Sequence, residues 1–139
     1  MKVRDWMSPD PVSLAPDATV AEARQHMEAQ GFRHLPVVDD DRLIGIVSDR
    51  DVAIGTEALR DAVRRHDVVT LLDDERPLEA VMSRSPHVIG PDADVSEAAR
   101  VLVSRRISAL PVVDGDAQLV GIITSVDCLL ATLRQTADL

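Results

Sequence analysis

The stretch that decides the fold is Arg33–Asp51, RHLPVVDDDRLIGIVSDRD, and a near copy of it stands at Ser108–Asp127, SALPVVDGDAQLVGIITSVD. Each copy holds two short apolar runs separated by a polar segment that is rich in aspartate. Such a pattern is typical of two strands joined by a hairpin turn. The chain therefore contains the same predicted hairpin twice.

The duplication extends beyond the hairpins. When the chain is shifted by 75 residues, 15 of the positions 7–42 are identical, and a shift of 76 gives four further identities over positions 43–51. Met7-Ser8 falls on Met82-Ser83 in this comparison. Matching by chance at ordinary composition would give roughly three identities over the same length. The sequence therefore holds two copies of one structural unit.

A helix is predicted before each hairpin, because apolar residues recur there at helical spacing. Thr19 with Glu22, and Asp94 with Glu97, have the spacing of a cap and its partner three residues later. Gly31 is placed to end the first of these helices.

Further elements complete each repeat. Brief strands are expected at Val12–Leu14 and His87–Ile89, and a final helix is expected to begin at Ser48 or Thr124. In the first repeat Thr56–Arg76 is predicted to extend this helix and then to add a charged connector. A short lead-in helix precedes each repeat.

The predicted order is strand, helix, strand, strand, helix, twice, which makes a mixed α/β (α+β) fold with helices on one face of each sheet. We place the first repeat with its lead-in helix at 1–62, a charged connector at 63–77, and the second repeat at 78–139.

Composition narrows the classes of function. The chain has 139 residues, 45% of them hydrophobic, and a net charge of −9, which repels a nucleic-acid backbone. Cys128 is the sole cysteine, so a disulfide within the chain and a multi-cysteine zinc site are excluded. The longest apolar stretches, such as Leu119–Ile123, are too short to span a bilayer, and residues 1–10 lack the apolar run of an export signal. We expect a cytoplasmic protein without a nucleic-acid or membrane partner and without a bound metal.

One motif could carry chemistry. Ser48 and Asp51, and likewise Thr124 and Asp127, place a hydroxyl residue three positions before an aspartate, directly after an apolar strand. One interpretation is a capping box that only stabilises a helix. The other is a ribonucleotide site, since a helix N-terminus attracts phosphate and a carboxylate accepts hydrogen bonds from the ribose diol. The motif by itself leaves both interpretations open.

The two quoted stretches together resemble the cystathionine-β-synthase-type (CBS) domain family, and the resemblance covers nearly the whole chain. It implies a stand-alone pair of β-α-β-β-α repeats that are related by a pseudo-twofold axis and packed sheet to sheet. It also implies up to two ligand clefts between the repeats, each lined by residues of both.

The resemblance assigns candidate site residues. The first cleft would join residues of both repeats. Arg33 and His34 would lie against phosphate, and His87 would lie at the edge of the base. The full set is Ser48, Arg50, Asp51, Arg33, His34, His87, Ile107, Ser108 and Ala109. The second cleft would use Thr124, Asp127 and Val12. It departs from the first because Val126 replaces Arg50 there.

The family resemblance implies a regulatory, energy-sensing module that binds AMP, ADP, ATP or S-adenosylmethionine as a regulatory ligand and requires no cofactor. A protein target would respond to the bound state, and a homodimer is expected. The alternative is a ligand-free scaffold for dimerisation or docking. An enzyme is not expected, since the sequence shows no nucleophile paired with a base.

Overall fold

The computed structural model describes residues 1–137, except for the side chains of residues 70 and 71. The first repeat contains α1 (Val20–Gln30), β2 (His34–Asp39), β3 (Arg42–Ser48), α2 (Thr56–Arg64) and α3 (Val68–Leu72). The second contains α4 (Val95–Arg105), β5 (Ala109–Val113), β6 (Leu119–Thr124) and α5 (Ser125–Ala137). The two lead-in segments each form a 3₁₀ turn and a short strand: η1 (Val3–Asp5) with β1 (Ser8–Pro9), and η2 (Leu78–Ala80) with β4 (Ser83–Arg84).

The helices that precede the hairpins begin and end as local sequence dictates. At the start of α1 the Glu22 amide donates to Thr19 Oγ1 over 3.1 Å in a complete capping box, and Gly31 ends the helix in the left-handed conformation at φ 75°. At the start of α4 the Asp94 carboxylate instead accepts from the amide of Ser96 over 2.9 Å. Asp94 is therefore the N-cap, as predicted, but its side chain accepts from Ser96, and the amide of Glu97 donates to the Asp94 backbone carbonyl over 3.0 Å.

Both hairpins form in the predicted places. In the first, His34 lies opposite Ser48 and Asp39 lies opposite Arg42, with a bulge between Val37 and Val38. The second hairpin repeats this register and has its bulge at the equivalent point. Each hairpin turns its apolar face toward the helices of its own repeat, and each repeat has its own cluster of buried apolar side chains.

The lead-in segments are exchanged between the repeats. Strand β1 pairs antiparallel with β6, and β4 pairs antiparallel with β3, so the two sheets have the orders β1-β6-β5 and β2-β3-β4. Val3 is buried in the cluster of the second repeat, and Leu78 in that of the first. The expected boundaries place each lead-in segment in the repeat that follows it. In the structure, each lead-in segment packs on the other repeat. The last two residues of the expected second repeat, 138–139, lie outside the described residues.

Two sequence predictions need correction. The expected strands at Val12–Leu14 and His87–Ile89 are reduced to single parallel bridges, from Leu14 to Val37 and from Ile89 to Val112. These bridges lie on the β2 and β5 edges, and the exchanged strands β4 and β1 pair with the opposite edges, β3 and β6.

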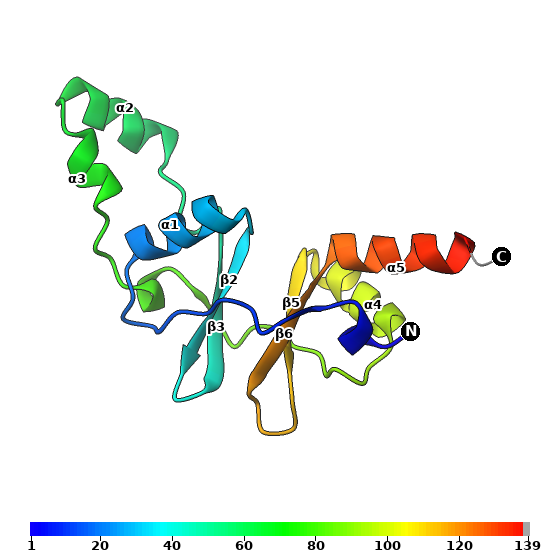
Figure 1. Cartoon of the computed structure of the whole chain (residues 1–139). Helices are drawn as coiled ribbons and strands as arrows, with labels where there is room; N and C mark the ends of the chain where they lie inside the picture. Colours follow the sequence, from blue (N-terminus) through cyan, green and yellow to red (C-terminus); the bar gives the residue numbers. More distant parts are fainter. Residues whose placement is uncertain (138–139) are drawn as a thin grey trace.

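The helix expected at Ser48 does not form. Only a turn follows Ser48, and α2 begins after Gly55 as a separate helix, Thr56–Arg64. Glycine and β-branched residues weaken a helix at this break. In Figure 1, α2 and α3 project away from the body of the molecule.

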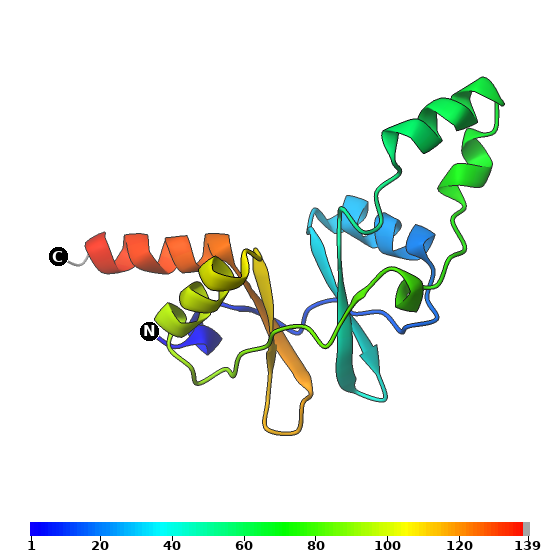
Figure 2. The same ribbon diagram turned by 180° about the vertical axis from the view of Figure 1, so that it is seen from behind.

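The hairpins β2–β3 and β5–β6 stand side by side, with the helices outside them, in both ribbon views (Figures 1 and 2). Their tips meet where Arg42 bridges Gln118 and the amide of Leu43 donates to the carbonyl of Ala117 over 3.4 Å. The predicted mixed α/β architecture of two sheet-and-helix repeats is confirmed.

The exchanged strands approach the hairpins at glycines. A Cβ added at Gly45 would lie 2.5 Å from Sδ of Met82 and 3.0 Å from the carbonyl oxygen of Ser83. Because a backbone atom is among these neighbours, β4 itself would have to move. We therefore expect Gly45→Ala to lower the free energy of unfolding by about 1–3 kcal/mol in urea denaturation.

Gly115→Ala is the matched control for this prediction. An added Cβ at Gly115 meets nothing within 4 Å. Its unfolding free energy should stay within about 0.5 kcal/mol of the wild type. Equal stability of the two variants would show that β4 does not pack tightly on β3.

Candidate functional site

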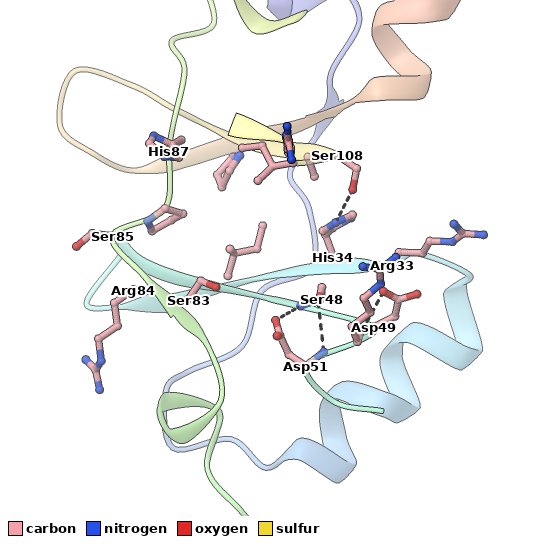
Figure 3. Close-up of a pocket in the computed structure, with 17 residues that line it drawn as sticks. Arg33, His34, Ser48, Asp49, Asp51, Ser83, Arg84, Ser85, His87 and Ser108 are labelled. Atoms are coloured by element: carbon pink, nitrogen blue, oxygen red, sulfur yellow. Dashed lines mark hydrogen bonds between the residues drawn. The ribbon is translucent and has the colours of Figure 1, made fainter. Parts of the chain in front are cut away.

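A pocket of about 720 Å³ lies between the two repeats (Figure 3). This volume is in the range of small-molecule sites. Nine residues predicted from the sequence line it: Arg33, His34, Ser48, Arg50, Asp51, His87, Ile107, Ser108 and Ala109. The structure therefore brings together all members of the expected first cleft.

The turn after β3 presents Ser48 and Asp51 to this pocket. The amide of Ser48 donates to Asp51 Oδ2 over 2.7 Å, and the amide of Asp51 donates to Ser48 Oγ over 3.3 Å. This is the reciprocal geometry of a capping box, formed on a single turn rather than on a continuous helix. The bond to the Ser48 amide uses Oδ2 of the carboxylate and leaves Oδ1 outside that contact.

A hydrogen bond joins the two repeats across the pocket. Ser108 Oγ and His34 Nε2 are 3.1 Å apart, and Figure 3 shows the two side chains pointing toward one another. Burial lowers the pKa of His34. The charge of Asp49 acts in the opposite direction, Arg33 lowers the pKa further, and Asp51 raises it. His34 is therefore mainly neutral at pH 7, and an incoming anion would favour its protonation.

Other pocket residues were not identified from the sequence. The exchanged lead-in contributes Ser83, Arg84, Ser85 and Pro86, and the remaining members are Ile46, Asp49, Arg106 and Pro111. The lead-in residues directly precede His87, whose place at the base was inferred from the family resemblance. Their position depends on β4 crossing to β3 of the other repeat, which no local pattern indicates.

The residues expected at the second cleft do not line this pocket. The amide of Thr124 donates to Asp127 Oδ2 over 2.8 Å, which repeats the bond of the first turn, and the Thr124 hydroxyl also donates to Oδ2 over 3.0 Å. This turn continues directly into α5. Val12 packs against the apolar cluster of the first repeat.

The described residues do not favour metal binding or thiol chemistry. Across residues 1–137, no group of three or more His, Cys, Asp or Glu side chains is arranged to hold a metal ion. Cys128 is buried, and desolvation together with the charge of Asp127 raises the pKa of its thiol. A raised pKa keeps the thiol protonated and weakly nucleophilic.

The fold and this site define a class: tandem β-α-β-β-α proteins with a ligand-sized cleft between their repeats. Within that class the chain belongs to the CBS domain family, whose model matches residues 3–54 and 78–134. The predicted family is thereby confirmed. The segment that contains α2 and α3 lies between the two matched ranges.

Solved structures of CBS pairs resemble the whole chain. The chain is 28% identical to CBSX2 from Arabidopsis thaliana, with a TM-score of 0.80 over 98% of this chain and 96% of that one. A structure of CBSX2 in complex with AMP is 29% identical, with a TM-score of 0.76 over 97% and 98%. The CBS domain pair of protein MJ0100, in complex with 5′-methylthioadenosine and S-adenosyl-L-methionine, is 25% identical, with a TM-score of 0.77 over 97% and 98%.

Relatives found by sequence include longer proteins. An uncharacterized protein of Methanocaldococcus jannaschii is 30% identical over 98% of this chain, which spans 46% of that protein. The inosine-5′-monophosphate dehydrogenase of the same organism is 33% identical over 86% of this chain, which spans 21% of the enzyme. A CBS domain-containing protein of Dictyostelium discoideum is 30% identical over 91% of this chain and 88% of its own length. The chain thus spans half or less of the first two relatives.

The lowered pKa of His34 predicts a pH dependence of stability. Unfolded His34 has its ordinary pKa of 6.5, above the folded value, so the unfolded state binds the proton more tightly. The stabilising contribution is present above that pH and is lost as the pH falls through it. We expect His34→Gln to reduce the loss of unfolding free energy between about pH 7 and pH 5 in urea titrations.

NMR titration of the imidazole gives the matching direct test. The His34 midpoint should lie below 6.5, and Asp49→Asn should lower it further, because the Asp49 carboxylate raises the pKa of His34. A midpoint above 6.5 in the wild type would contradict the assignment of a desolvated, neutral imidazole.

Proposed function

We propose that this chain is a regulatory module that binds an adenosine ligand in the pocket between its repeats. The observation that carries the proposal is the Ser48–Asp51 turn, which faces His34 and Ser108 in one ligand-sized pocket. The similarity to CBS pairs in complex with AMP, or with 5′-methylthioadenosine and S-adenosyl-L-methionine, supports it.

In this proposal Asp51 accepts hydrogen bonds from the ribose hydroxyls through the oxygen that the Ser48 amide does not use. The Ser48 hydroxyl, with Arg33 and Arg50, binds phosphate. Ile107 and Ala109 supply apolar surface from the second repeat, next to His87. A ligand held from both sides favours one relative position of the repeats, and this is the signal that a protein target would detect.

The proposed role is regulatory rather than catalytic. In the dehydrogenase relative the chain corresponds to about a fifth of the enzyme, so the chemistry of that enzyme does not transfer with the match. The ligand acts as an effector in this role and not as a required cofactor. We propose a cytoplasmic location, where adenine nucleotides are abundant; among residues 1–137 no helix is long and apolar enough to cross a membrane.

We further propose that the chain forms a twofold homodimer through α5. The buried face of this helix carries Cys128 and Ala131. Large apolar side chains follow a stripe on the opposite face: Val126, Leu129, Leu130 and Leu133 are 62%, 63%, 50% and 65% exposed. A helix that is apolar on both faces is usually covered on both. The same surface would serve the alternative function, a ligand-free scaffold.

The first test compares the two equivalent aspartates. Asp51→Ala should weaken AMP or ATP binding by roughly ten- to hundredfold in calorimetric titration, because charge-assisted hydrogen bonds to the ribose are lost. Asp127→Ala is the matched control, since its carboxylate makes the same bond to the amide of its turn. Both variants should lose up to about 1 kcal/mol of unfolding free energy.

The pair of variants separates the two functions. An effect on binding that is clearly larger for Asp51→Ala supports the ligand site in this pocket. Asp51→Ala binding AMP as tightly as the wild type would refute the site. A wild type with no affinity for AMP, ATP or S-adenosylmethionine would favour the scaffold.

The second test addresses assembly. We expect a dimer in light scattering at tens of micromolar, and a monomer for the double variant Leu129→Glu/Leu133→Glu, because two buried charges would oppose association. Gln135→Glu adds a charge to the same helix outside the apolar stripe and should leave the dimer intact. A monomeric wild type would count against the proposed interface.

A further inference from the structure

Arg106 occupies a helix end that ordinarily favours glycine. It ends α4 in the left-handed conformation at φ 55° and ψ 44°. The equivalent residue at the end of α1 is Gly31, with φ 75°. A side chain at such a backbone position is disfavoured by contact of its Cβ with the following carbonyl. Arg106 therefore lowers the stability of the folded state. Gly31, at the equivalent position of the first repeat, has no Cβ and avoids this strain.

The position of Arg106 connects it to the proposed site. Arg106 lines the pocket, two residues before Ser108. Ser108 Oγ lies 3.1 Å from His34 Nε2, and His34 lies opposite Ser48 in the strand register. Arg106 thus comes from the second repeat to the end of the pocket that Ser48 and His34 form from the first.

The charges around the pocket point to an anion. Four arginines line it, Arg33, Arg50, Arg84 and Arg106, against the two carboxylates of Asp49 and Asp51. This local excess of positive charge stands in a chain with a net charge of −9. The positions equivalent to Arg50 and Arg106 in the other repeat are Val126 and Gly31, so these two charges are specific to one cleft.

We infer that Arg106 is a specificity-determining residue, which selects an adenosine ligand that carries phosphate over the uncharged nucleoside. The inference rests on the proposed function and names the ligand class of the same site. Its guanidinium forms charge-assisted hydrogen bonds with phosphate oxygens that Ser48 and Arg50 bind from the first repeat. A phosphate bound by Arg106 on one side and by Ser48 and Arg50 on the other links the two repeats. The nucleoside has no phosphate and cannot make this link.

The test compares Arg106→Asn with Arg105→Asn, using AMP and adenosine as probes in calorimetric titration. Asparagine tolerates the left-handed conformation, so the first variant removes the charge without adding strain. The second removes the same charge from the neighbouring residue, which does not line the pocket. We expect Arg106→Asn to weaken AMP binding by about five- to tenfold and to leave adenosine binding unchanged. Arg105→Asn should leave both affinities unchanged.

Two further measurements complete the design. The melting temperature of Arg106→Asn should be at or above that of the wild type, since the residue is retained for binding and not for stability. Arg106→Lys should keep most of the AMP affinity, because it keeps the charge.

Each contrary outcome has a distinct meaning. If Arg106→Asn binds AMP like the wild type while Asp51→Ala binds it weakly, this inference is overturned and the proposed function stands. If Arg106→Asn weakens AMP and adenosine equally, the residue supports the pocket as a whole and is not a determinant of specificity. If the wild type binds no adenosine compound, both the proposed function and this inference fail.

Discussion

The structure depends on the exchange of the two lead-in strands. β4 lies against β3 at Gly45, and β1 lies against β6 at Gly121, with the sulfur atoms of Met82 and Met7 over these glycines. Only a residue without a side chain allows this approach. The exchange places each lead-in in the apolar cluster of the other repeat, so neither repeat has a complete core without its partner. Two small units thereby behave as one folding unit.

The same exchange builds the pocket. β4 carries Ser83 and Arg84 to the edge of β3, and the chain then passes Ser85 and His87 along the wall opposite the Ser48 turn. The remaining wall comes from the end of α4 and the start of β5. A ligand in this pocket would touch segments that are distant in sequence but adjacent through the exchange, which makes the relative position of the repeats sensitive to occupancy.

Duplication has left the two halves chemically different. The Thr124 turn continues into α5, whereas the chain leaves the Ser48 turn and reaches Gly55 before α2 begins. The carbonyl of Val52, at the end of the Ser48 turn, accepts a hydrogen bond from Arg24 of α1, and Arg24 also contacts Asp74 over 3.2 Å. Hydrogen bonds from Arg76, with a smaller contribution from the charge of Arg24, lower the pKa of Asp74 and keep it ionised. The turn of the candidate site is thus held to α1 and to the segment that returns from α3.

The sequence by itself determined what depends on neighbours a few residues apart. The hairpins follow from short apolar runs around aspartate-rich turns, α1 from the capping box of Thr19 and from Gly31, and the Ser48–Asp51 contact from a spacing of three residues. Which residues of the two halves would share a cleft was implied by the family resemblance and not by local spacing.

Only the tertiary structure decided the rest. The crossing of β1 and β4 and the reduction of two expected strands to single bridges depend on which surfaces can be buried together. The same holds for Arg106. Its local signal is an unfavourable backbone position, and its place in the pocket appears only when the two repeats are brought together around the end of α4. Local hydrogen bonds and residue propensities determine which helices and turns form. The pairing of distant strands and helices is determined by the apolar surface that the pairing buries. The free energy of that burial depends on several distant stretches of sequence at once.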